Sequence, residues 1–201
     1  MTAPHAIVLA GGRSSRFGTD KLAVLVDGEP ILHHALRAVA AMPAEGDVIL
    51  VIGIEAPVPP LPFDLGACVR VERDPEAFGG PLVGLAAALA VLPDDALAIV
   101  VAGDMPSLRP PVLRLLAETL AADLTADVAL LQHDEPAPLP AALRVYAARA
   151  AAGRALAGGD RSLRSCIAAL TVTLVPSAAW RALDADAATL RDVDTPADLG
   201  A

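Results

Sequence analysis

Short hydrophobic runs rich in Val and Ile alternate along the chain with segments whose apolar residues recur at helical spacing. The runs predict β-strands at residues 6–10, 48–52, 69–72, 97–102, 128–131 and 172–175. The helically spaced segments predict helices at residues 31–42, 82–92, 111–122 and 162–170. This alternation is typical of a mostly parallel sheet with helices on both faces. We therefore expect a doubly wound α/β fold, with residues 1–201 forming a single domain.

Composition narrows the classes of protein to which the chain could belong. It has 201 residues, 55% of them hydrophobic, which is enough for one sizeable core. A net charge of −9 argues against a broad surface for nucleic acid or anionic membranes. The chain has neither a secretory signal pattern nor an apolar run of the roughly 20 residues that cross a bilayer. We expect a cytoplasmic protein, and we expect the proline-rich stretch 55–64 to be a surface loop.

The stretch LAGGRSSRFGTDK, residues 9–21, follows the first predicted strand and gathers positive charge. It contains Lys21, the single lysine of a chain with 15 strongly basic residues. Gly11 and Gly12 would let backbone N–H groups approach an anion closely. The glycine spacing fits neither the Walker pattern nor the dinucleotide fingerprint. A solvated turn is the plainer alternative, but a lysine retained where arginine is otherwise used favours a phosphate-binding loop.

Carboxylates follow two other predicted strands, where ligands of such sheets bind. Asp104 follows the strand at residues 97–102 and could hold a hard cation such as Mg²⁺ or cap the next helix. Asp74 could accept hydrogen bonds from a base or ribose, or support a turn. Near the C-terminus, Asp192, Asp194 and Thr195 precede a short predicted helix. Asp194 could be a second metal ligand or part of a helix cap.

Six segments, in this order and spacing, resemble the MobA-like nucleotidyltransferases over essentially the whole chain: LAGGRSSRFGTDK, FGGPLVGLAAAL, GDMPSL, PLPAAL, GDRSLRSCI and DVDTPADL. The resemblance implies a Rossmann-like nucleotidyltransferase fold. LAGG, GPLVGL and PLPAAL are most similar to the branch that transfers GMP from GTP to molybdopterin, with Mg²⁺ as cofactor and pyrophosphate as product. That branch carries Asn near the end of the second strand, whereas VILVIGIE has none, so one nucleotide contact is absent or comes from the backbone.

The resemblance, together with the charge of the loop, assigns expected roles to individual residues. Lys21, Arg16 and Asp104 are the expected catalytic residues, and Asp104, with Asp194 as the second candidate, is the expected Mg²⁺ ligand. The four histidines are expected to be surface or packing residues, because an acceptor phosphate is already ionised and needs no general base. The expected nucleotide-binding residues are Leu9, Ala10, Gly11, Gly12, Arg13, Lys21, Asp74 and Asp104.

Two other functions remain open at this point. One is a nucleotidyltransferase that uses CTP or a different phosphorylated acceptor. The other is a nucleotide-binding accessory subunit that has lost catalysis and works through a partner. For the GMP transferase, the expected partners are GTP, the molybdopterin acceptor, and molybdoenzymes or proteins of cofactor biosynthesis, with no nucleic acid and no membrane.

Overall fold

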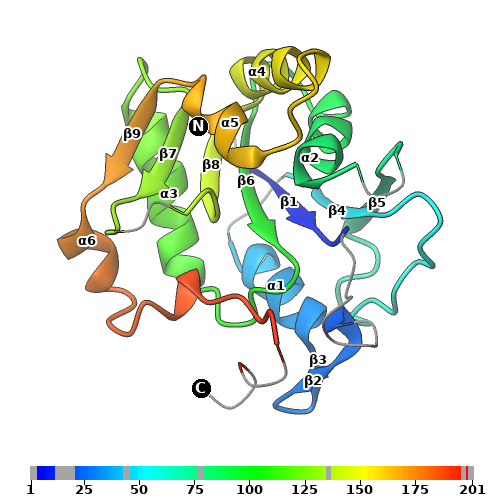
Figure 1. Ribbon diagram of the computed structural model, residues 1–201. Coiled ribbons are helices and arrows are strands. Elements are labelled where there is room, and N and C mark those ends of the chain that lie inside the picture. Colours follow the sequence, from blue (N-terminus) through cyan, green and yellow to red (C-terminus); the bar gives the residue numbers. More distant parts are fainter. Residues whose placement is uncertain are drawn as a thin grey trace.

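The computed structural model describes residues 4–11, 21–42, 46–76, 79–134, 137–195 and 198. Its centre is a sheet of seven strands (Figure 1). In spatial order these are β5 (Val69–Arg73), β4 (Val48–Ile52), β1 (His5–Leu9), β6 (Leu97–Ala102), β8 (Ala141–Arg144), β7 (Val128–Leu131) and β9 (Val172–Val175). A two-stranded hairpin, β2 (Leu25–Val26) and β3 (Glu29–Pro30), precedes the first α-helix.

Most neighbouring strands of the sheet are parallel. β5, β4, β1 and β6 run in one direction, and β9 is parallel to β7. β8 is antiparallel to both of its neighbours, β6 and β7. All five residues of β4 are buried, as expected for an apolar strand covered on both faces. The predicted doubly wound, mostly parallel fold is confirmed.

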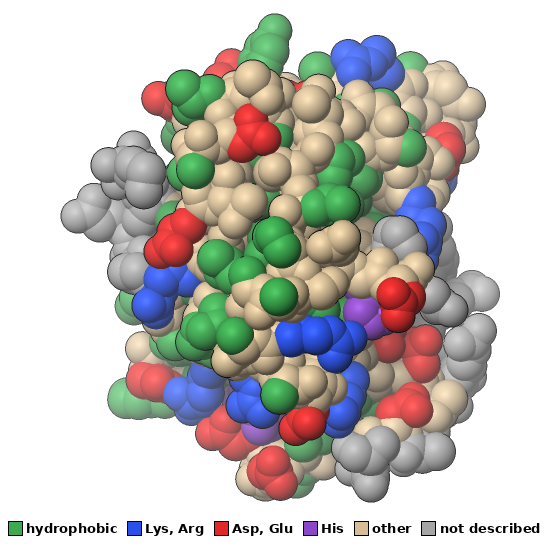
Figure 2. Space-filling model, turned by 90° about the vertical axis from the view of Figure 1, so that its left-hand side faces the viewer, with side chains coloured by type: hydrophobic (Ala, Val, Ile, Leu, Met, Phe, Trp, Pro, Cys, Tyr) green, Lys and Arg blue, Asp and Glu red, His purple; other side chains and the backbone are tan. Residues whose placement is uncertain are grey.

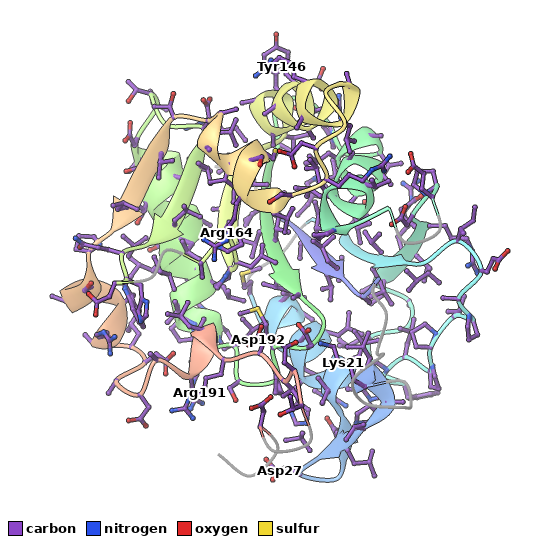
Figure 3. All side chains as sticks on the ribbon, in the orientation of Figure 1. Lys21, Asp27, Tyr146, Arg164, Arg191 and Asp192 are labelled. Carbon is purple, nitrogen blue, oxygen red and sulfur yellow. The ribbon has the colours of Figure 1, made fainter. Side chains whose placement is uncertain are left out.

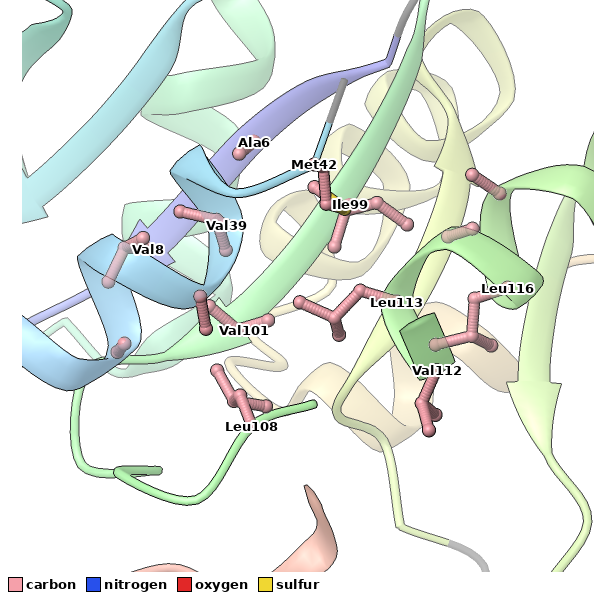
Figure 4. Packing of buried hydrophobic residues seen from close by; sticks show 14 of the residues in the cluster. Ala6, Val8, Val39, Met42, Ile99, Val101, Leu108, Val112, Leu113 and Leu116 are labelled. Atoms are coloured by element: carbon pink, nitrogen blue, oxygen red, sulfur yellow. The ribbon is translucent and has the colours of Figure 1, made fainter. Parts of the chain in front are cut away.

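Two hydrophobic clusters cover the two faces of the sheet. One holds the apolar residues of α1 (Ile31–Ala40), α3 (Pro110–Ala122) and α6 (Ser177–Arg181), together with Val8 and Val101 from the sheet (Figure 4). The other holds α2 (Pro81–Ala90), α4 (Val145–Ala157) and α5 (Leu163–Ala168), with Ile7 and Val100. Adjacent residues of one strand therefore point to opposite clusters, as strand geometry requires.

The face around the edge strand β9 is chemically mixed (Figure 2). Val172 and Leu174 of β9 are partly exposed, as is Leu183 after α6. Acidic and basic side chains are interspersed with these apolar ones over the face in view. Among the described residues, no helix is long and apolar enough to cross a membrane.

The sequence predicted six of the seven strands of the sheet and four of its helices, with bounds within about two residues. It did not predict β8, α4, the short helix α6 or the hairpin of β2 and β3. β8 is only four residues long and lies in a stretch interrupted by prolines. α4 is rich in alanine, and alanines around a helix weaken the contrast between its apolar and polar sides.

A buried carboxylate fixes the segment that follows α6. The side chain of Asp184 is 2% exposed and accepts hydrogen bonds from the N–H groups of Ala188 (3.1 Å) and Thr189 (2.7 Å). Thr189 Oγ1 accepts from the N–H of Arg109, just before α3. These bonds hold the 3-10 helix η2 (Ala188–Leu190) against the start of α3, and so position the residues that follow it.

We expect Asp184→Asn to lower the free energy of unfolding at pH 7 by about 1–3 kcal/mol, because one carboxylate oxygen becomes an amide donor facing backbone N–H groups. Burial alone would raise the pKa of Asp184, but the hydrogen bonds from Thr189 and Ala188 and the charge of Arg109 lower it. A lowered pKa gives stabilisation that is complete above the unfolded value of about 4 and is lost as the pH falls through the folded value.

Urea unfolding at pH 7 and pH 3 measures this effect, and the gap between wild type and Asp184→Asn should narrow in acid. Asp186→Asn, at an exposed position two residues away, is the matched control and should unfold like wild type. Equal stability of the two variants at pH 7 would contradict the role given to Asp184.

Candidate functional site

The ends of four strands bring the candidate residues to one edge of the sheet. β1 is followed by Ala10 and Gly11, β4 by Gly53, β5 by Asp74, and β6 by Gly103 and Asp104. These four strands are parallel, so their carboxyl ends lie together. The chain leaves β1 toward β4 on one side, while β6 lies on the other, which makes this edge the switch point where ligands of such sheets bind.

Lys21 lies at this edge in an acidic environment. It begins the 3-10 helix η1 (Lys21–Ala23), and its Nζ donates to Asp104 Oδ2 at 2.5 Å. Nζ also donates to the carbonyl oxygen of Val193 at 3.2 Å and to Asp194 Oδ1 at 3.4 Å. The ammonium therefore joins three segments of the chain that are far apart in sequence.

The Lys21–Asp104 pair is largely shielded from solvent. Each of the two side chains is 19% exposed, whereas Asp194 is 54% exposed. Burial alone would lower the pKa of Lys21, but the hydrogen bonds and charges of Asp104 and Asp194 raise it above its ordinary value. Lys21 therefore carries its positive charge throughout the neutral pH range.

Asp192 adds another carboxylate to this neighbourhood. Burial, followed by the charges of Asp194 and Asp104, raises the pKa of Asp192. Figure 3 shows Lys21 and Asp192 near the carboxyl end of β6, while Tyr146 lies at the opposite end of the molecule. Among the described residues, the three carboxylates of Asp104, Asp192 and Asp194 therefore surround the single ammonium of Lys21.

Asp104 has the properties of a metal ligand. Its Oδ1 is buried and has no hydrogen-bond partner among the described residues, while Oδ2 is held by Lys21. No three His, Cys, Asp or Glu side chains form a metal-binding group within the described ranges. One or two carboxylates are enough to bind Mg²⁺, because this ion takes its remaining oxygen ligands from water and substrate phosphates. Asp104 does not cap α3, whose first turn has no side-chain cap.

A pocket of about 940 Å³ opens beside the Lys21 site. Its wall includes the predicted residues Ala10, Gly11 and Asp74. Asp74 is 7% exposed, and its Oδ1 accepts the N–H of Glu76 at 2.9 Å, which orients the carboxylate. Gly80, with φ of +89°, also lines the pocket and turns the chain into α2. Most of the remaining lining is apolar, as in pockets that take a flat organic ring.

The predicted site residues thus form two neighbouring groups. Ala10, Gly11 and Asp74 line the pocket, and Lys21, Asp104 and Asp194 form the charged group. Leu9 connects the two, since its carbonyl oxygen accepts the N–H of Gly103 at 2.9 Å while its side chain packs in the core. The predicted residues Gly12, Arg13 and Arg16 lie outside the described part of the chain.

Some parts of the site were not predicted. The stretch Glu55–Pro60, expected to be a surface loop, is a loop that forms a wall of the pocket. The Val193 carbonyl that holds Lys21 carries no side-chain signal at all. Thr195 was predicted to cap a short terminal helix, most of which lies outside the described residues. Asp198 Oδ2 accepts from the N–H groups of Asp194 (3.0 Å) and Thr195 (2.6 Å), which is the return bond of a capping box.

Comparisons with known proteins show the family to which the chain belongs. A family model described as the MobA-like NTP transferase domain matches residues 6–174. The probable molybdenum cofactor guanylyltransferase of Chloroflexus aggregans is 32% identical over 197 residues, covering 96% of this chain and 90% of that protein. Its namesake from Trichormus variabilis is 36% identical over 129 residues, covering 64% of this chain and 58% of that protein.

Solved structures share the fold. Molybdopterin-guanine dinucleotide biosynthesis protein A from Archaeoglobus fulgidus superposes with a TM-score of 0.76 at 24% identity, over 98% of this chain and 95% of the other. The 2-C-methyl-D-erythritol 4-phosphate cytidylyltransferase from Thermus thermophilus superposes with a TM-score of 0.69 at 16% identity, over 96% and 94% of the two chains. At these identities the likeness concerns the fold alone.

Proposed function

The chain belongs to the MobA-like NTP transferase family, and from that premise we propose that it transfers GMP from GTP to the terminal phosphate of molybdopterin, releasing pyrophosphate. The observation that carries the proposal is the half-buried Lys21–Asp104 pair beside a pocket that Asp74 lines. The pair offers a cation and a carboxylate for the triphosphate and its metal. The pocket offers a carboxylate for the base.

The reaction is an in-line displacement at the α-phosphorus of GTP. A phosphate oxygen of the acceptor forms a new bond to that phosphorus, and the bond to the β-phosphate oxygen breaks, so the electron pair leaves with pyrophosphate. The acceptor phosphate is already ionised near neutral pH, so no residue has to remove a proton from it. Both reactants are anions, and the main task of the site is to cancel charge and align them.

Lys21 is the residue best suited to that task. Its raised pKa keeps the ammonium protonated, and its flexible stem allows it to follow the phosphates as pyrophosphate separates. Gly11, with Gly12, Arg13 and Arg16 as predicted from the sequence, would surround the same phosphates. Asp104, with Asp194 as second candidate, would hold Mg²⁺, which would neutralise part of the negative charge of the phosphates.

Asp74 supports a preference for guanine. Guanine presents N1–H and N2–H₂ as neighbouring donors, and a carboxylate can accept from both. Cytosine presents one amino group next to an unprotonated ring nitrogen, which a carboxylate does not complement.

We also propose that residues 1–201 form one domain, because a single sheet includes strands from His5 to Val175.

The proposal is tested by incubating the protein with Mg²⁺, molybdopterin and each of GTP, CTP, ATP and UTP, with mass analysis of the product. We expect a GMP adduct with GTP, and one pyrophosphate released for each adduct. A CMP adduct would instead assign the chain to cytidylyl transfer. Tight GTP binding without any adduct or pyrophosphate would favour an accessory subunit.

Lys21→Ala should lower the rate of GMP transfer by at least ~10²-fold, the scale of losing one electrostatic contact to the transition state.

Asp104→Asn should shift the Mg²⁺ dependence of GMP transfer to higher Mg²⁺ concentrations, while its circular dichroism spectrum stays that of wild type. Arg70→Ala, which removes a surface arginine paired with Glu72, is the control and should transfer GMP normally. Wild-type turnover in Lys21→Ala, or a wild-type Mg²⁺ response in Asp104→Asn, would remove that residue from the mechanism.

Asp74→Asn should weaken the discrimination between GTP and ITP, which lacks the N2 amino group. The wild-type protein should prefer GTP by about 10-fold or more, since one hydrogen bond to a charged group is at stake, and the variant should approach equality. Steady-state kinetics with each nucleotide measure the ratio of the two kcat/KM values. An equal loss with both nucleotides would move the contact of Asp74 from the base to the ribose.

A further inference from the structure

Arg73, the last residue of β5, holds the loop that follows β4. Its Nη1 donates to the carbonyl oxygens of Gly53 at 3.1 Å, Ile54 at 2.8 Å and Ala56 at 2.8 Å. β5 is the edge strand next to β4, and Arg73 is in register with Ile52, the last residue of β4. The guanidinium thus reaches across from the neighbouring strand and binds three carbonyl oxygens within four consecutive residues of the loop.

The loop needs such support because it has little of its own. Three of the six residues from 55 to 60, all of which line the pocket, are the prolines Pro57, Pro59 and Pro60, which have no N–H to donate. Within the loop, the N–H of Ala56 donates to the Gly53 carbonyl at 3.1 Å. At the far end, His33 Nε2 donates to the Pro60 carbonyl at 2.9 Å. Side chains from β5 and α1 therefore fasten the two ends of this wall.

The three carbonyls that Arg73 binds belong to residues that line the pocket, whereas Arg73 itself does not line it. The same pocket is lined by Asp74, the next residue in the chain, whose N–H donates to the Ile52 carbonyl at 2.8 Å. The position of the wall and the position of the base-binding carboxylate are therefore set by adjacent residues on one strand.

We propose that Arg73 is a positioning residue for the nucleotide: by binding the carbonyl oxygens of Gly53, Ile54 and Ala56, it sets the distance between the pocket wall and Asp74 and thereby controls nucleotide affinity. This inference rests on the proposed function, in which the pocket takes the base of GTP. Arg73 is exposed, so its removal leaves no hole in the hydrophobic core. Its effect should therefore fall on nucleotide binding rather than on folding.

The test compares Arg73→Met and Arg73→Lys with Arg70→Met. Arg70 lies on the same strand but pairs with Glu72 at 2.7 Å instead of binding the loop, which makes it a matched control. With saturating acceptor, Arg73→Met should raise KM for GTP by about 10-fold with kcat nearly unchanged, because charge-assisted hydrogen bonds to the wall are lost. Arg73→Lys should recover part of the loss, since an ammonium carries three donors.

Two binding measurements test whether the loss of GTP affinity in Arg73→Met arises at the pocket wall and not at the phosphate-binding residues. Calorimetry with GDP should show the same loss of affinity as KM. Competition by inorganic tripolyphosphate, which has no base, should be the same in Arg73→Met as in wild type. A wild-type KM and GDP affinity in Arg73→Met would overturn the proposal, and so would an equal loss for tripolyphosphate or an equal loss in Arg70→Met.

Experiments on the wild-type protein distinguish a failure of the proposed GMP transfer from a failure of the role given to Arg73. If wild type forms no GMP adduct, calorimetry with GDP, CDP, ADP and UDP identifies the nucleotide that it does bind, and the Arg73 variants are compared with that diphosphate. If wild type binds none of the four, the pocket is not a nucleotide site and the role of Arg73 is overturned with it.

Discussion

A positively charged amine that is largely removed from water needs oxygen partners, and the site is organised around this need at Lys21. The partners come from the end of β6, as the Asp104 carboxylate, and from the segment after η2, as the Val193 carbonyl and the Asp194 carboxylate. Because the amine requires all of these oxygens at short range, the start of η1, the end of β6 and the distant segment at 193–194 must meet. The hydrogen bonds of Asp184 and Thr189 hold η2 against the start of α3, and this positions the segment at 193–194 close to Lys21.

The same edge of the sheet serves two chemically different purposes. On the β6 side of β1 it concentrates charge, with the half-buried ammonium of Lys21 among carboxylates and, within the described structure, an unpartnered carboxylate oxygen at Asp104. On the β4 and β5 side it forms a mostly apolar pocket whose lining includes two acidic residues, the buried Asp74 and the exposed Glu55. A nucleotide has the same division between a charged triphosphate and a flat base. β1, which lies between the two sides, is where the sugar would connect them.

Much of this arrangement was predictable from local patterns, and some of it was not. Strands that are buried over most or all of their length, such as β4 and β6, are continuous apolar runs, and the residues after them, including Asp104, could be found by the rule that ligands bind at strand ends. β8 and α4 were missed because a four-residue strand and an alanine-rich helix give weak periodic signals. The contact of Lys21 with Val193 spans 172 residues and uses a backbone oxygen, so no local pattern encodes it. The proline-rich wall of the pocket has no periodicity either, since it is held by side chains of β5 and α1.

The route by which Lys21 acquires its partners separates the sheet from the charged group along the chain. Val193 and Asp194 follow every strand of the sheet, and β9 ends at Val175. The described residues of both hydrophobic clusters also precede them, since the last is Trp180 and the last one packed against a cluster is Leu190. A chain cut after residue 191 would therefore keep the sheet and both clusters, but Lys21 would lose the Val193 carbonyl and the Asp194 carboxylate.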